Sequence, residues 1–211
     1  MIRLLLPLLL SSAMAAPAGP AKKPVKAAAA PAAAAKPMVF DIDPDHSAIT
    51  FRIRHLVGRV SGKFTRYSGE FSGTREQAKT WKASAKIDTA SIDTGVAKRD
   101  EHLRSADFFD AARCPEISFA SKQALPMGKT RAKLKGDLTI HCVTKPVVLD
   151  LESDGAIVTD PWGKLRAGIS ASAKINRKDF DMTFNKVLDK GSTLLGDDVD
   201  IQIDIEGTAR P

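Results

Sequence analysis

Residues 164–175, Lys-Leu-Arg-Ala-Gly-Ile-Ser-Ala-Ser-Ala-Lys-Ile, alternate between polar and apolar side chains without a break. A period of two is typical of a β-strand with one face in the protein interior and the other in water. The same alternation runs through 47–54, 81–88, 131–142 and 199–206, and weaker runs cover 57–64, 67–72, 116–124 and 147–158. Turn sequences such as Ser-Asp-Gly at 153–155 separate the runs. The sequence therefore predicts an all-β domain of about eight antiparallel strands.

Small side chains on the inward faces favour a hollow interior. Long strands with one wet and one dry face either stack as a sandwich or close into a barrel. The small inward residues are Ala83, Ala85, Gly136, Ala167, Ala171 and Ala173. An eight-stranded barrel lined partly by such residues leaves room for a ligand, so we expect an elongated apolar cavity. The alternative is a filled interior, in which Trp81, Phe51, Phe64 and Phe119 occupy that space.

The stretch 91–115 interrupts the strand pattern. It is rich in charged residues between Lys98 and Arg104 and then contains the pair Phe108-Phe109. Thr94 and Ser105 are residue types that cap helix N-termini, and Pro115 stops a helix. We therefore expect two short helices that form a lid or plug over one end of the β-structure. An ordinary crossover connection is the alternative.

The N-terminal part of the chain differs in composition from the rest. Residues 1–15 have an apolar run from Leu4 to Leu10 and an Ala-Met-Ala site, which predicts a signal peptide cleaved after Ala15. Residues 16–37 are almost wholly Ala, Pro and Lys and predict a disordered linker. The single folded domain is then 38–211.

The linker also explains the net charge of +7. Residues 1–37 contain five Lys and Arg and no acid, which leaves 27 basic and 25 acidic side chains in 38–211. This balance argues against nucleic acid as a partner of the folded domain. The linker lysines leave open a weak contact with an anionic membrane surface.

Five motifs, in order along the chain, resemble the YceI-like family. They are Asp43-x-Asp45-His46-Ser47 with Phe51-x-Ile53-x-His55; Ser91-Ile92-Asp93-Thr94-Gly95 with Arg99-Asp100-x-His102-Leu103; Asp107-Phe108-Phe109 with Pro115-x-Ile117-x-Phe119; Gly136-x-Leu138-Thr139-Ile140-x-x-Val143-Thr144-Lys145-Pro146-Val147; and Asn176-Arg177-x-Asp179-Phe180. The resemblance covers essentially all of 38–211. It implies an extended, lipocalin-like antiparallel barrel that binds long isoprenoid or other amphiphilic lipids in the periplasm. Cys142 and Asp181 stand where the family usually has Gly, and at Asp181 a different local backbone is expected.

No sequence motif points to catalysis or to a bound metal. The chain has no H-E-x-x-H, C-x-x-C or G-x-S-x-G spacing and no Gly-rich phosphate loop. Its densest polar cluster is Arg99, Asp100, Glu101 and His102, which is open to three interpretations: a general base, a contact for a lipid head group, or ion pairs that lock the lid. Asn176, Arg177 and Asp179 form a second cluster, interpreted as a structural turn. His141, on the polar face of its strand, is expected at the surface.

We therefore predict a non-enzymatic, exported lipid-binding barrel in the periplasm, without a cofactor and with homodimerisation left open. The alternatives are an enzyme that acts on a lipid in the same cavity, and a tethered adaptor without ligand. The predicted cavity-lining residues are Phe51, Ile53, Trp81, Ile87, Phe108, Phe119, Leu138, Ile140, Ile169, Phe180 and Ile203. The head-group candidates are Arg99, His102 and Arg104, because guanidinium groups suit phosphate.

The two cysteines, Cys114 and Cys142, give conflicting signals. An even number of cysteines in an exported protein favours a disulfide. Strand parity opposes it, because Ile117 places odd residues inward on one strand while Ile140 places even residues inward on the next. Cys114 would then point outward and Cys142 inward, which a disulfide does not allow unless a bulge intervenes. We expect two free thiols, with Cys142 a small buried apolar residue.

Overall fold

The computed structural model describes residues 37–74, 77–153, 155–188 and 192–211. The predicted signal peptide, 1–15, and all but the last residue of the predicted linker, 16–37, lie outside the described residues. The first strand begins at Met38. Among the described residues, no helix has the length and apolar character that a membrane span requires.

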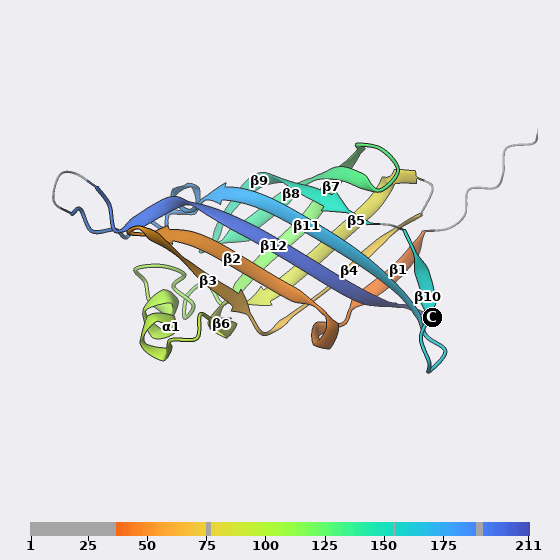
Figure 1. Ribbon diagram of the computed structural model, residues 1–211, viewed down its shortest axis with the longest axis horizontal. Helices are drawn as coiled ribbons and strands as arrows, with labels where there is room; N and C mark the ends of the chain where they lie inside the picture. Colours follow the sequence, from red (N-terminus) through yellow and green to blue (C-terminus); the bar gives the residue numbers. More distant parts are fainter. Residues whose placement is uncertain (1–36, 75–76, 154, 189–191) are drawn as a thin grey trace, which may run out of the picture. The chain divides into compact units, whose positions relative to one another are not determined.

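Twelve strands and one α-helix make up the described fold (Figure 1). The strands are β1 (Met38–Ile42), β2 (Ala48–His55), β3 (Gly58–Phe64), β4 (Tyr67–Thr74), β5 (Gln77–Asp88), β6 (Ile92–Asp93), β7 (Glu116–Pro126), β8 (Arg131–Ile140), β9 (Val143–Glu152), β10 (Ile157–Thr159), β11 (Leu165–Asn176) and β12 (Leu195–Ala209). The helix is α1 (Ala97–Arg104), and the 3-10 turns are η1 (Pro44–His46), η2 (Thr89–Ser91) and η3 (Arg177–Phe180).

Eight of these strands close into an antiparallel barrel. The ring order is β11-β9-β8-β7-β5-β4-β1-β12, and β12 returns to β11 through a ladder from Arg166↔Thr208 to Asn176↔Asp198. The remaining strands, β2, β3, β6 and β10, extend the same sheet beyond this ring. β12 pairs with β1 near its end and with β2 along the rest, so β1 and β2 act as one strand broken by η1. The predicted all-β, eight-stranded barrel is confirmed.

The alternation that was read from the sequence sorts the barrel into an inner and an outer face. Ile117, Leu134, Ile140 and Ile205 are buried on the inner face. Their polar neighbours face outward and form cross-strand ion pairs such as Lys133–Asp150, 2.6 Å apart. Inward apolar burial at every second residue therefore fixes the register of each ladder.

The 91–115 insert forms one helix instead of two. Thr94 does not cap α1: Val96 is the N-cap, and the backbone N–H of Thr94 donates to the carboxylate of Asp100, 2.9 Å away. Ser105 is the C-cap of α1 and starts no second helix: its hydroxyl donates to the carbonyl of His102, and the residues that follow form turns. Beyond it, turn hydrogen bonds such as that from the N–H of Phe109 to the carbonyl of Leu103 lead to Cys114. The insert lies across one end of the barrel (Figure 1).

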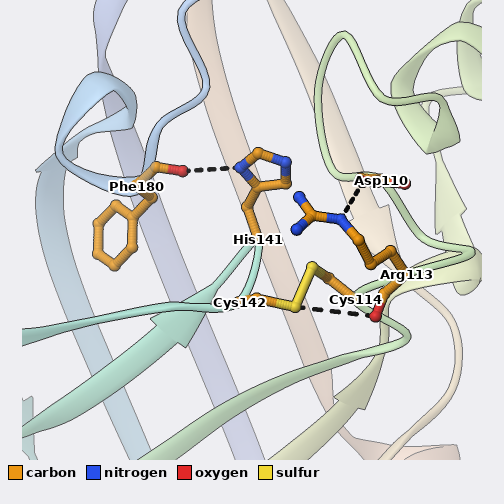
Figure 2. The surroundings of a disulfide bond; sticks show 6 residues. All are labelled: Asp110, Arg113, Cys114, His141, Cys142 and Phe180. Carbon is orange, nitrogen blue, oxygen red and sulfur yellow. Dashed lines mark hydrogen bonds and ion pairs between the residues drawn. A yellow bond between two sulfur atoms is a disulfide. The ribbon is translucent and has the colours of Figure 1, made fainter.

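Cys114 and Cys142 form a disulfide, so the prediction of two free thiols is wrong (Figure 2). Strand parity does not govern either residue. Cys114 precedes β7, and β8 ends at Ile140, so His141 and Cys142 form a two-residue turn with positive φ angles of 52° and 61°. Burial is also the reverse of the prediction, since Cys114 is 2% exposed and Cys142 lies at the surface.

The early end of β8 also corrects the prediction for His141. Its ring is half-buried, and Nδ1 lies 3.1 Å from the carbonyl oxygen of Phe180 (Figure 2). Asp181, like Cys142, has a positive φ, 59°. Both positions thus adopt the left-handed backbone conformation that favours glycine. The turn is therefore present at both, although Cys142 and Asp181 stand where the family usually has Gly.

Candidate ligand-binding cavity

The barrel encloses one large apolar cavity of about 700 Å³. Its inner end is formed by Leu134, Leu149, Leu151 and Ala171, which also pack against one another in a buried cluster. At the other end the lining reaches exposed side chains, Lys98 at α1 and Lys186 in the segment before β12. The cavity is therefore closed within the barrel and opens at the end that carries α1. Its volume lies within the range of roughly 300–1,000 Å³ typical of small-molecule sites.

Most of the predicted lining residues border this cavity. They are Phe51, Ile53, Ile87, Phe108, Phe119, Leu138, Ile140, Ile169 and Ile203. Trp81 does not: it packs against the buried cluster at the inner end, and its indole N–H donates to the carbonyl of Thr74, 3.1 Å away. Phe180 is also absent from the lining, because η3 buries it to 1% exposure. Whether the lining residues contact a ligand stays a prediction.

The inward glycines contribute less space than expected. A Cβ atom at Gly136 would lie 2.6 Å from the ring of Phe119, and one at Gly62 would lie 2.4 Å from the ring of Phe51. Each ring covers its glycine and fills the space of the missing side chain. The free volume is bordered instead by alanines, namely Ala83, Ala85 and Ala171. Aromatic rings therefore fill the interior next to Gly62 and Gly136, as the alternative expected, but they do not fill the cavity as a whole.

The segment between η3 and β12 supplies lining that the sequence did not reveal. Met182, Phe184, Leu194 and Leu195 border the cavity. The described residues 182–188 and 192–194 form no strand apart from an isolated bridge between Val187 and Thr193, so no periodic signal marked them. The cluster of apolar residues in this connection was the only available hint.

Arg177 anchors that segment at the mouth of the cavity. Its guanidinium donates to the carbonyl oxygens of Met182 and Phe184, at 2.6 and 2.8 Å, and to the carboxylate of Asp197 at 3.2 Å. Burial lowers the pKa of Arg177, and the charge of Asp197 opposes that effect. Asn176 accepts a hydrogen bond from the backbone N–H of Lys178 and so caps η3. This cluster is a structural turn network, as the sequence indicated.

Of the three head-group candidates, Arg99 and His102 border the cavity and Arg104 does not. Arg104 donates to the carbonyl oxygens of Ala90 and Ile92, at 2.8 and 2.9 Å, and so holds the insert against η2 and β6. Arg99 donates to the hydroxyl and carbonyl of Thr94. His102 Nε2 lies 2.8 Å from Asp107 Oδ2, and its ring meets those of Phe108 and Phe184 edge-on. These bonds fix both side chains at the mouth.

Two carboxylates and a histidine form a cluster at the opposite end of the barrel. Among the described residues, Asp43, His46 and Glu206 form one group whose ligand atoms lie within 4.8 Å. Arg166 already pairs with both carboxylates, at 2.6 Å to Asp43 and 2.7 Å to Glu206, and also with Asp160. Hydrogen bonds from Arg166 and then His46 lower the pKa of Asp43 to about 2. The cluster therefore joins β11 and β12 to the start of η1.

A closed antiparallel barrel around an apolar cavity with a polar mouth defines a class, the lipocalin-like ligand-binding barrels. The chain belongs, more narrowly, to the family of the YceI-like domain, whose family model matches residues 40–207.

Curated relatives and solved structures agree with this assignment. The chain is 35% identical to a UPF0312 protein of Vibrio cholerae over 180 residues, which are 85% of this chain and 90% of the relative. It is similar to the YceI protein of Campylobacter jejuni, with a TM-score of 0.65, 31% identity, and coverage of 75% of this chain and 90% of that one.

Two more distant structures share the fold. One is BcnA of Burkholderia cenocepacia, with a TM-score of 0.67 and 21% identity, covering 78% of this chain and 98% of that one. The other is a domain of Saccharophagus degradans described as polyisoprenoid-binding, with a TM-score of 0.60 and 17% identity, covering 81% of this chain and 98% of that one. At these identities the likeness concerns the fold alone.

Proposed function

We propose that the protein binds one long amphiphilic lipid of the isoprenoid type in the barrel cavity, for carriage or storage. The observation that carries the proposal is the cavity itself: its volume is about 700 Å³, apolar side chains line it along the barrel, and Lys98, Arg99, His102 and Lys186 border it at the end that carries α1. An apolar chain gains free energy by leaving water for such a space. The description of the Saccharophagus degradans domain as polyisoprenoid-binding supports the same ligand class.

The head group of the lipid would lie at the mouth. Arg99 and His102 face the cavity there together with Lys98 and Lys186. Neither lysine forms an ion pair with a described residue. Cationic donors of this kind suit a phosphate or a polar ring substituent. Arg104 is withdrawn from the proposal because it does not border the cavity and bonds instead to the carbonyl oxygens of Ala90 and Ile92.

A binding role is favoured over an enzymatic one. The pair His102–Asp107 has the geometry of an oriented base, but it lies at the surface of the mouth, 45% and 53% exposed. A catalytic base would need to reach a reacting atom of the lipid in a site that excludes water. We further propose that the protein works in the periplasm, a proposal that rests on the predicted signal peptide in residues 1–15.

Filling the cavity tests the proposal. Ala171 lies at the inner end of the cavity and Ser172, its neighbour on β11, faces outward. Ala171→Trp should displace the lipid chain, while Ser172→Trp adds the same bulk outside. Native mass spectrometry with lipid extraction should find one long-chain lipid per protein in the wild type and in Ser172→Trp, and much less in Ala171→Trp.

Ala85→Phe guards against a folding defect, because Ala85 borders the cavity on β5 and is not among the residues packed against the cluster of Ala171. A wild-type protein without any co-purifying or added lipid would refute the proposal and favour the adaptor. A chemically altered lipid after incubation would favour the enzyme.

A further inference from the structure

Exposed apolar side chains gather around the cavity mouth. Val57, in the β2–β3 turn, is fully exposed, and Val187 is 78% exposed in the segment before β12. Val96, at the start of α1, and Leu56 are 47% and 44% exposed. The three segments that carry them all contribute to the cavity lining, through His55 and Val60, through Thr94 and Val96, and through Lys186 and Leu194. Figure 1 shows these segments at the end of the barrel that carries α1.

Hydrogen bonds hold two of the segments together. The N–H of Leu56 donates to the carbonyl of Leu194 at 2.9 Å, and the N–H of Leu194 donates to the carbonyl of Lys186 at 2.9 Å. The guanidinium of Arg54 donates both to the carbonyl of Leu56 and to the hydroxyl of Thr193. The backbone next to Val57 and next to Val187 is therefore held in place, because Leu56 and Lys186 are both bonded to Leu194.

The described residues of these segments carry several basic side chains. We use the name cationic rim for residues 54–60, 94–99, 184–188 and 192–194. The rim contains Arg54, Arg59, Lys98, Arg99 and Lys186, and acidic residues adjoin it in the sequence at Asp93, Asp100, Glu101 and Asp189. Arg59 pairs with Asp200, 2.6 Å away on β12. Lys98 and Lys186 are exposed and form no ion pair with any residue that the structure describes.

We propose that the cationic rim is a docking surface for a bilayer that contains anionic phospholipid. Its lysines and arginines would lie among the phosphate groups, and Val57 and Val187 would enter the interface below them. The mouth of the cavity would then open onto the bilayer, so that an apolar chain moves between membrane and barrel without crossing water. The inference deepens the proposed function and rests on it only for the movement of the lipid chain between the bilayer and the cavity.

The opposite end of the barrel offers a comparison. Val158 and Trp162, in and after β10, are 58% and 80% exposed. That hairpin contains Asp160 beside Lys164 and does not border the cavity. Exposed apolar residues are thus present at both ends of the barrel, but among the described residues only those of the rim lie beside the opening of the cavity. The hairpin supplies a matched control.

Co-sedimentation of the full chain with vesicles tests the proposal. The vesicles contain phosphatidylcholine alone, or phosphatidylcholine with an equal amount of phosphatidylglycerol. We expect binding only to the anionic vesicles, weakened by salt. Val57→Ser with Val187→Ser should lower the partition coefficient about tenfold, the effect of removing two partly inserted apolar side chains. Val158→Ser with Trp162→Ser should leave it unchanged. Lys186→Glu should reduce it at least fivefold.

Equal vesicle binding by the rim variant and the wild type would overturn the proposal, and so would loss of binding in the hairpin variant instead. A wild-type dimer that the rim variant dissociates would also overturn it, since a second copy would then cover the rim. Lipid occupancy of the cavity, measured on the same samples, separates this proposal from the function. Val57 and Val187 do not line the cavity, so the rim variant should retain its lipid. An empty cavity with intact vesicle binding would refute the function alone.

Discussion

At the scale of single residues, Arg166 joins three segments that are distant in sequence. It pairs with Asp43 before η1, with Asp160 in the β10–β11 turn and with Glu206 on β12. The side chain of Arg166 is only 15% exposed, so these pairs are screened less than surface pairs. The YceI-like motif residues Asp43 and His46 thus stabilise the barrel at the end opposite to the mouth.

The Asp43–Arg166 pair predicts a specific acid dependence. Hydrogen bonding to Arg166, and then to His46, lowers the pKa of Asp43 from 3.8 to about 2. The ionised carboxylate is favoured in the folded state, so its contribution to stability is complete above pH 4 and disappears as the pH falls through 2. Asp43→Asn should lower the free energy of unfolding by about 1–2 kcal/mol at pH 7, and the difference from the wild type should vanish near pH 2.

Urea unfolding across this pH range measures the effect. Asp45→Asn is the control, because the Asp45 side chain is exposed and bonds to no described residue. A difference between Asp43→Asn and wild type that is the same at pH 7 and pH 2 would contradict the assignment.

Gly136 should tolerate no side chain. A Cβ atom there would lie 2.5 Å from the carbonyl oxygen of Ala120 and 2.6 Å from the ring of Phe119. Gly136→Ala should therefore reduce the free energy of unfolding by about 1–3 kcal/mol through overpacking. The matched control is Gly168→Ala on β11, whose Cβ would meet nothing closer than 3.8 Å. Equal melting temperatures for the two variants would show that the ring of Phe119 yields freely.

At the scale of elements, the insert is attached to the barrel at both of its ends. Arg104 bonds to the carbonyls of Ala90 and Ile92 next to β6. At the other end the Cys114–Cys142 disulfide joins the last residues of the insert to the β8–β9 turn. The path between them includes Phe108 and Phe109, which border the cavity. The disulfide therefore limits how far the insert can move from the mouth.

Removing the disulfide should loosen the insert more than the barrel. Counting thiols under denaturing, non-reducing conditions should find none free. Closing a loop of 28 residues contributes about 3–4 kcal/mol in the chain-entropy treatment, so Cys114→Ala with Cys142→Ala should lower the melting temperature. Amide hydrogen exchange should become faster in 105–115, with β11 and β12 least affected at short times. Uniform acceleration over the whole barrel would contradict this picture, and two free thiols would restore the original expectation.

At the scale of the whole molecule, the folded unit is the barrel that begins at Met38. Closure between β11 and β12 completes the ring, in which β9 and β11 are joined over three residue pairs, from Ser170↔Glu152 to Ser172↔Asp150. Homodimerisation, left open by the sequence, stays a prediction that sedimentation can check.

The N-terminal segment should be dispensable for folding. Limited proteolysis should remove residues up to about Pro37 and leave a core that starts near Met38. Because Ala, Pro and Lys in that segment offer little apolar surface to bury, the melting temperature of the core should equal that of the full chain. A large fall in melting temperature after truncation would show that the segment contributes to the stability of the barrel.

The sequence by itself determined the barrel and most of the lining. Alternation such as that of 164–175 fixes which side chains face inward, because a one-residue slip would expose every apolar side chain of the strand. Phe51, Leu138 and Ile203 were placed on the inner face by this local rule, and no tertiary information was needed.

Only the tertiary structure decided how strands end and what fills the interior. Parity gave the wrong answer for Cys114 and Cys142, since the left-handed turn at His141 and Cys142 takes the chain out of the ladder. Trp81 and Phe180 face inward but lie beyond the cavity, because neighbours from other strands occupy the space around them. Arg104 bonds to backbone carbonyls and does not border the cavity. Arg177 instead holds the segment that follows η3 at the mouth. Each depends on which distant segments meet, and periodicity along one strand carries no such information.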